Sequence, residues 1–465
     1  MDFAVTEKKI MAKEKSWIPH PLKLVGYVGV ISLYVVFTVL PAFSATATDE
    51  IAELKATIKA LQRRVEALEA QQEKKETISS EIEKPTVSSE IEKLKDELAL
   101  TVKKGDFPGS WKRPGSGMSF KVGGYVKLTF YKDFDFMPSG DFFVQTRIPV
   151  SGTPESRKDG ETRFNARESR INLDVRGSTP LGRARAFIEG DFFGSGDSFR
   201  LRHAYGELGH ILAGQTWSTF MDISAWPELL EIEGPDAAAF ARQGQLRWTQ
   251  TVREDLTVAV ALEDPNGDFT IDGVGDSDDE NSKWPDFTSH LRYEDSWGHL
   301  QFGGLVRQIR FDDGIEKKDD VIGWGTTVGG NISTFGLDGI QFQGAYGKGI
   351  GRYIEGLIDT GSDAATNSSG DLKALPAGAI FASYQHWWTD TLRSTAGGEY
   401  GFVDNSSGQP GTATKNWQGA VINLVWNPLP RLLLGIEFGW GRHEVKDGRD
   451  GTAKRIQTST QFNFD

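Results

Sequence analysis

Arginines that recur at alternate positions are the residues of this sequence best suited to do chemistry. They lie in short segments between residues 170 and 292, where polar and apolar residues alternate and arginine outnumbers the acidic residues of the same face. Arginine stays charged and presents a planar fork of N–H donors that matches carboxylate or phosphate. A row of arginines along a passage favours anions. The predicted lining residues are Arg170, Arg176, Arg183, Arg185, Arg200, Arg202, Arg247 and Arg292, with Glu189 and Asp191.

An acidic segment follows the predicted hairpin 199–217. Residues 218–241 show no strand alternation, and we expect them to fold into the passage opposite the arginines. Opposed rows of charge would create a transverse field that orients charged solutes. The predicted constriction residues are Asp222, Glu228, Glu231 and Glu233. In the alternative interpretation, the arginines pair with acidic neighbours on the wall and are merely neutralised; these neighbours are Asp174, Glu189, Asp191 and Glu207.

Patterns typical of catalysis or metal binding do not emerge from the sequence. The histidines show no metal-ligand spacing, no nucleophile elbow is present, and the acidic stretch 264–286 lacks the spacing of an EF-hand loop. The chain has no cysteine, which excludes thiolate chemistry. We therefore predict no catalytic residue, metal site or cofactor. The net charge of −13 also argues against a nucleic-acid partner.

The arginines must be positioned by strands, because the period of residues 106–465 is close to two. Ile171, Leu173 and Val175, for example, alternate with polar residues. Segments of this kind are about 9 to 13 residues long, which suits tilted strands that cross a membrane. A soluble sandwich or propeller would need a packed core, and the polar face is too charged to form one.

The connections between these segments alternate in length. Tight turns such as 209–210 and 389–390 are interleaved with long loops such as 218–241 and 351–376, so all tight turns lie at one end. Outer-membrane barrels have short periplasmic turns and longer outer loops. Residues 106–465 therefore predict an all-β fold, a transmembrane antiparallel β-barrel of about 16 strands.

The first 47 residues have the pattern of a secretory signal peptide. A lysine-rich start precedes the uncharged apolar run Leu24–Leu40, and Ala45 and Ala47 provide small residues for cleavage. The alternative is a transmembrane anchor, since the apolar run is long for a signal. Export agrees with a location in the cell outer membrane.

Residues 48–105 predict a periplasmic α-helical coiled coil and helical linker. Its apolar residues are spaced alternately by three and four, which is a heptad seam that requires self-association. The alternative is a charged, partly disordered spacer. The seam residues are Ile51, Leu54, Ile58, Leu61, Val65 and Leu68.

Several motifs resemble the DcaP-like trimeric porin family. They are Arg200–Gly206, Leu212–Phe220, Ile188–Gly194 and Gly123–Lys127. The resemblance implies a signal peptide, a periplasmic coiled coil, a sixteen-stranded barrel and a homotrimer within outer-membrane lipid and lipopolysaccharide. It also implies passive diffusion of small anions, notably dicarboxylates, rather than enzymatic activity. One departure is that Phe464 is followed by Asp465, whereas barrels usually end on an aromatic residue.

Two other functions remain open on the sequence alone. One is an outer-membrane barrel enzyme. The other is a mainly structural envelope tether, with the coiled coil reaching towards peptidoglycan.

Overall fold

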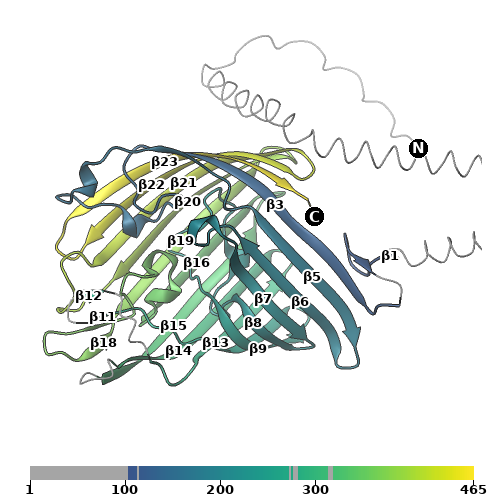
Figure 1. Ribbon diagram of the computed structural model, residues 1–465, viewed down its shortest axis with the longest axis horizontal. Helices are drawn as coiled ribbons and strands as arrows, with labels where there is room; N and C mark the ends of the chain where they lie inside the picture. The colour runs from purple at the N-terminus through teal and green to yellow at the C-terminus, as the bar shows by residue number, and fades with distance from the viewer. Residues whose placement is uncertain (1–102, 113–114, 272–273, 276–280, 313–317, 465) are drawn as a thin grey trace, which may run out of the picture. The chain divides into compact units, whose positions relative to one another are not determined.

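A closed antiparallel β-barrel forms the body of the protein (Figure 1). The computed structural model describes residues 103–112, 115–271, 274–275, 281–312 and 318–464. The predicted signal peptide, the heptad seam and nearly all of the predicted helical segment lie outside these described residues. The barrel prediction is confirmed, because sixteen strand positions close the sheet.

The barrel strands follow one another around the wall in chain order. Strands β4 and β5 are two pieces of one position, since both pair with β3. The strands are β3 (Met118–Asp133), β4 (Thr162–Asn165), β5 (Arg170–Thr179), β6 (Gly182–Asp191), β7 (Arg200–Leu208), β8 (Ile211–Trp217), β9 (Arg242–Arg253), β10 (Leu256–Glu263), β13 (Asp286–Asp295), β14 (Gly298–Asp312), β15 (Lys318–Ser333), β16 (Gly339–Lys348), β19 (Pro376–Trp387), β20 (Leu392–Val403), β21 (Thr414–Leu429), β22 (Leu432–Val445) and β23 (Asp450–Asn463).

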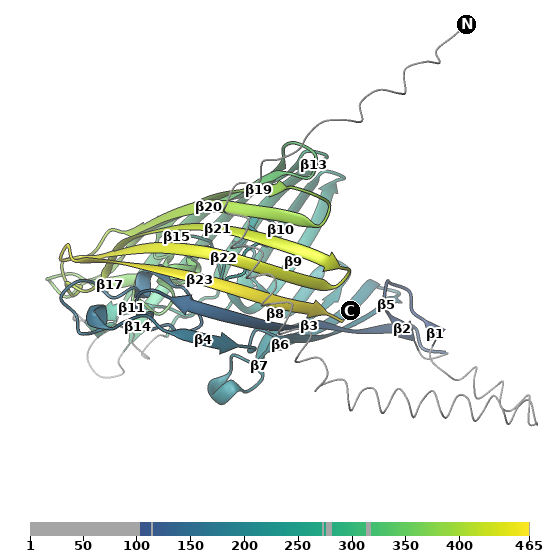
Figure 2. The same ribbon diagram turned by 90° about the horizontal axis from the view of Figure 1, so that it is seen from above.

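Closure occurs where the last strand meets the first. Strand β23 pairs antiparallel with β3 from Arg455 opposite Asp133 to Asn463 opposite Tyr125. Both views show the yellow β23 running beside the blue β3 (Figures 1 and 2). A small hairpin precedes the barrel, in which β1 (Lys103–Lys104) pairs with β2 (Trp111–Lys112).

The wall is apolar outside and polar inside, which is the reverse of a soluble protein. Leu246 and Leu262 are neighbours on β9 and β10, and both are exposed on the outer face. The adjacent residues Gln245 and Glu263 are also paired across these strands, and both are buried on the inner face. A barrel in lipid requires this alternation, because hydrocarbon covers its outer face.

Short turns and long loops lie at opposite ends of the barrel. At the long-loop end, β11 (Phe269–Ile271), β12 (Val274–Gly275), β17 (Ala364–Thr366) and β18 (Leu372–Ala374) form a separate four-stranded sheet. Arg307 on the wall anchors the loops that carry this sheet. Its fully buried guanidinium lies 3.1 Å from Asp286 and 2.8 Å from Asp363.

The hydrophobic core lies inside the barrel, where long loops pack against the wall. Phe220 and Ile350 belong to this core. A Cβ at Gly325 would lie 2.8 Å from Ile350 and 3.1 Å from Phe220, so a larger residue at this wall position would force the loop side chains to shift.

The only helices in the described part of the chain are single 3-10 turns, and none is long or apolar enough to cross a membrane. They are η1 (Gln145–Arg147), η2 (Glu155–Arg157), η3 (Ser195–Asp197), η4 (Ile223–Ala225), η5 (Gly351–Tyr353) and η6 (Glu355–Leu357).

Candidate functional site

Residues 218–241, here called the inward segment, lie inside the barrel against strands β10 to β23. Acidic and amide side chains of the wall accept hydrogen bonds from backbone N–H groups of the segment. These N–H donors therefore have partners although the segment forms no regular secondary structure. These bonds run from Leu230 to Glu437 (2.8 Å), from Ala237 to Glu399 (2.7 Å) and from Ala239 to Gln343 (2.7 Å).

Two further loops, 134–161 and 349–375, pack against the inward segment. The N–H of Glu355 donates to the carbonyl of Ala238 at 3.0 Å. Ala239 forms an isolated antiparallel β-bridge with Ile354 of the same loop. The N–H of Gln145 donates to Asp236 at 2.5 Å. Three loops therefore narrow the lumen, whereas the sequence predicted only one.

Three of the four predicted constriction carboxylates pair with basic groups of the wall on their own side. Asp222 lies 3.2 Å from Arg292 and 2.8 Å from His299, Glu228 pairs with Arg393, and Glu231 lies 3.4 Å from Arg455. Within the described residues Glu233 has no ion pair. Its carboxyl is therefore the least compensated of the four.

Five of the eight predicted arginines form ion pairs, as the alternative interpretation anticipates. Asp174 and Asp191 each accept two arginines, and Arg292 pairs with Glu294 and Asp222. The wall pairs on β5 to β7 are Arg176–Asp174 (2.6 Å), Arg185–Asp174 (2.9 Å), Arg185–Glu207 (4.0 Å), Arg200–Asp191 (2.7 Å), Arg202–Glu189 (3.1 Å) and Arg202–Asp191 (3.2 Å).

The other three predicted arginines have no carboxylate within ion-pair distance among the described residues. Arg170 lies over the ring of Tyr125, 5.4 Å from its centroid. Arg247 donates to the carbonyl of Trp217 at 3.2 Å. Arg183 is exposed beside the tight turn between β5 and β6. Full positive charge therefore remains on parts of this wall.

Sequence reasoning missed the paired Arg393 and Arg455 of the site and two further arginines without an ion pair. Arg147 is exposed on η1 within loop 134–161, and Arg242 lies over Trp217 at 5.2 Å where β9 begins. Both act electrostatically on Glu355 and have no ion pair within the described residues. Neither could be found from alternation, because one lies in a loop and the other directly follows the inward segment.

Carboxyl groups of the inward loops are easier to protonate than usual. Burial raises the pKa of Glu233 to about 7, although the charges of Arg147 and Arg200 oppose this rise. Burial also raises the pKa of Glu355 well above its ordinary value, and the charge of Glu233 adds to the effect. Glu233 therefore loses negative charge near neutral pH, while the arginines keep their positive charge.

The comparisons with known proteins agree with this architecture. The chain matches the family described as DcaP outer membrane protein over residues 110–464. The outer membrane channel DcaP of Acinetobacter baumannii is 21% identical with a TM-score of 0.66, and the match covers 76% of this chain and 99% of that one. The anion-selective porin from Comamonas acidovorans is 10% identical with a TM-score of 0.52, covering 75% and 100% of the two chains.

Curated proteins yield no match to the chain. The family and its structural relatives are outer-membrane channels and porins, not enzymes. The resemblance inferred from the sequence motifs is thereby confirmed, and the protein belongs to the DcaP outer membrane protein family, with the fold of an outer-membrane porin.

Proposed function

We propose that the protein is a passive, anion-preferring porin for small hydrophilic solutes, with small dicarboxylates as the preferred class. The observation that carries this proposal is the unequal compensation of charge at the three inward loops. Arg147 and Arg242 have no ion pair among the described residues, whereas Asp222, Glu228 and Glu231 all have one. Glu233, Asp236 and Glu355 also lack an ion pair there, but burial raises their pKa values and so reduces their negative charge. The negative charge of the constriction is therefore neutralised to a greater extent than its positive charge.

The basic groups follow the wall from the long-loop end towards the tight turns. Arg200 starts β7 at the long-loop end, Arg247 lies within β9, and Arg183 lies next to the turn after β5. A carboxylate solute could exchange one guanidinium partner for the next, because each presents the same fork of donors. A dicarboxylate spans two such groups at once, which favours it over a monocarboxylate of similar size.

The name of one structural relative agrees with this charge preference, since the Comamonas porin is described as anion-selective. Reversal potentials in planar bilayers under a KCl gradient test the proposal. We expect a potential of the sign set by chloride permeation, and strong cation preference would refute the proposal. Liposome swelling with succinate, acetate and an uncharged sugar would then rank the solutes.

We also propose that the protein works as a homotrimer. Strand β8 has seven residues, fewer than the roughly 9 to 11 needed to cross a bilayer at the usual tilt. The neighbouring strands β5 to β7, of 9 or 10 residues, expose apolar side chains such as Ile171, Ile188 and Leu201. Contact with further copies of the chain would cover this wall where lipid fits poorly.

The heptad seam of residues 51–68 supports the same association, from the periplasmic side in the predicted orientation. Native mass spectrometry of the detergent-solubilised protein would measure the number of copies. A monomer at micromolar concentration would contradict the homotrimer without affecting the proposed selectivity.

A further inference from the structure

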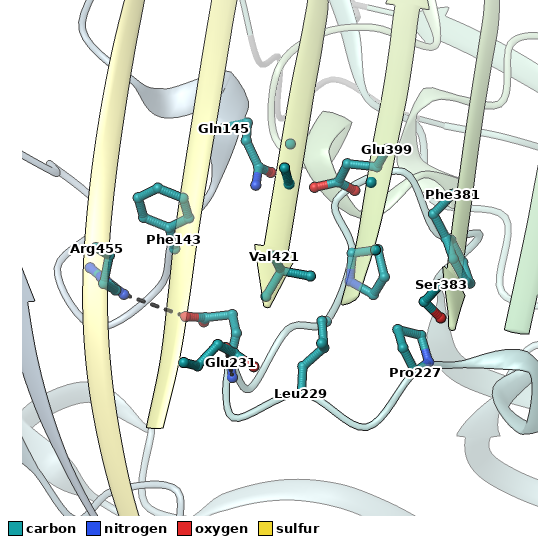
Figure 3. A pocket seen from close by; sticks show the side chains of 18 of the residues that line it. Phe143, Gln145, Pro227, Leu229, Glu231, Phe381, Ser383, Glu399, Val421 and Arg455 are labelled. Carbon is teal, nitrogen blue, oxygen red and sulfur yellow. Dashed lines mark hydrogen bonds and ion pairs between the residues drawn. The ribbon is translucent and has the colours of Figure 1, made fainter. Parts of the chain in front are cut away.

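A small cavity lies behind the inward segment, between it and strands β19 to β23 (Figure 3). Its volume is about 50 Å³. A buried water needs roughly 10–15 Å³ by this measure, so the cavity holds a few waters or one small ion with a water. Gln145 and Glu399 extend towards each other on one side, and Glu231 points towards Arg455 on another (Figure 3). Pro227 and Leu229 of the inward segment line another side of the cavity, which is partly open.

Oxygen atoms of the lining lack hydrogen-bond donors among the described residues. Gln457 is 2% exposed, and its Oε1 has no partner there. The orientation of this amide is fixed, because its Nε2 donates to Glu437 at 2.6 Å. Oε1 of Glu231 and Oε1 of Gln145 are also buried without such a partner. A buried acceptor of this kind costs stability unless a donor or a cation satisfies it.

The charges of the lining are also unbalanced. Glu231, Glu399 and Glu437 contribute three carboxylates against the single guanidinium of Arg455. Arg455 is already engaged by Asp133, with distances of 2.6 and 3.2 Å between the paired atoms. The carboxyl of Glu437 is compensated by N–H donors of Leu230, Glu231, Asn423 and Gln457. Uncompensated buried charge is strongly unfavourable, so a positive charge is expected near Glu231 and Glu399 when they are ionised.

We propose that this cavity binds one small monovalent cation of the size of potassium or ammonium, held by Glu231 and Gln457 with Glu399 and Gln145 around it. Mixed carboxylate and amide oxygens suit a weakly charged ion. Ca²⁺ is usually held by several carboxylates, whereas the proposed ligands include only two.

The cation would tie the inward segment to the wall, since Glu231 belongs to the segment and Gln457 to β23. This role is separate from solute selectivity. An anion-preferring pore would thus contain a structural cation on the far side of its constriction loop.

The decisive experiment uses wild-type crystals soaked in rubidium chloride. Burial raises the pKa of Glu231 to about 8, so the crystals are held near pH 9, where its carboxylate is charged. We expect an anomalous peak about 3 Å from Oε1 of Glu231 and Oε1 of Gln457. A cavity without such a peak at molar rubidium would overturn the proposal and would mean that protons balance the charge instead.

Thermal unfolding in detergent provides an independent measurement at constant ionic strength. We expect the midpoint to rise by about 2 °C or more when rubidium replaces N-methylglucamine, because a ligand that binds only the folded state stabilises it. Glu231→Gln should abolish this rise, whereas Glu444→Gln at the outer rim should keep it. An equal rise in both variants would count against the cavity. Should Glu231→Gln fail to fold, the crystal experiment still decides.

Discussion

Removal of the positive charge at Arg147 should weaken the anion preference of the pore. This side chain is exposed on loop 134–161 and acts electrostatically on Glu233 and Glu355 of the other two inward loops. It lies outside the barrel strands and has no ion pair within the described residues. The substitution Arg147→Gln therefore removes charge from the constriction without breaking an ion pair of the described residues.

The size of the effect follows from Coulomb's law. A unit charge about 6 Å from a passing ion contributes about 0.7 kcal/mol in a water-like dielectric. Loss of this charge raises the barrier for an anion and lowers it for a cation, so the two effects combine to about 1.4 kcal/mol. The ratio of chloride to potassium permeability should then fall about tenfold.

Reversal potentials at low and high salt provide the assay. The effect should be large in 0.1 M KCl and much smaller in 1 M KCl, where the Debye length falls to roughly 3 Å. Arg157→Gln is the matched control, because Arg157 is an exposed arginine of the same loop that lies at the outer rim. If both variants shift the potential equally, the charge acts through the general field of the pore, and the assignment to the constriction is wrong.

Three further perturbations should have distinct outcomes. Lowering the pH from 8 to 6 should increase the anion preference, because Glu233 has a pKa of about 7 and loses its negative charge; Glu233→Gln should reduce this response but not remove it, since Glu231 with a pKa of about 8 also titrates in this range, and an unchanged response in the variant would exclude Glu233. Gly435→Leu should lower single-channel conductance, because a Cβ there would lie 2.8 Å from Leu230 and push the inward segment into the passage; unchanged conductance would show that the segment adjusts. Arg307→Met should lower the free energy of unfolding by about 3–5 kcal/mol in urea titrations, because it leaves Asp363 buried without its partner; a loss below 1 kcal/mol would contradict this reasoning.

The barrel could be predicted from the sequence because two simple signals coincide. Lipid outside and water inside impose a strict period of two, so exposed Leu246 and Leu262 alternate with buried Gln245 and Glu263. The connections alternate between short and long, which places all short turns at one end of the barrel and all long loops at the other. The break between β4 and β5 was not predictable, because residues 166–169 carry no distinct turn signal and the whole link reads as one long loop.

The site was less accessible to sequence reasoning, for a physical reason. Alternation shows which face a strand residue occupies, but it does not show which partner that residue finds. Asp174, for example, accepts both Arg176 and Arg185, which no spacing rule reveals. The roles proposed for the predicted lining and constriction residues therefore remain predictions, while their positions in the lumen are described by the structure.

The charge of the constriction depends on which wall receives the loops. Inward glycines such as Gly325 and Gly435 leave room for Phe220 and Leu230, and these glycines lie on the long strands β15 and β22. The loops therefore occupy the glycine-bearing wall, where glutamates accept their backbone N–H groups. The arginine-bearing strands β5 to β9 carry fewer such contacts, and the side chains of Arg176, Arg185 and Arg200 keep exposed fractions of 45%, 26% and 36%. Glycine placement on one wall thus leaves the opposite, basic wall available to the solute, so substitutions at these glycines should alter selectivity even though glycine carries no charge.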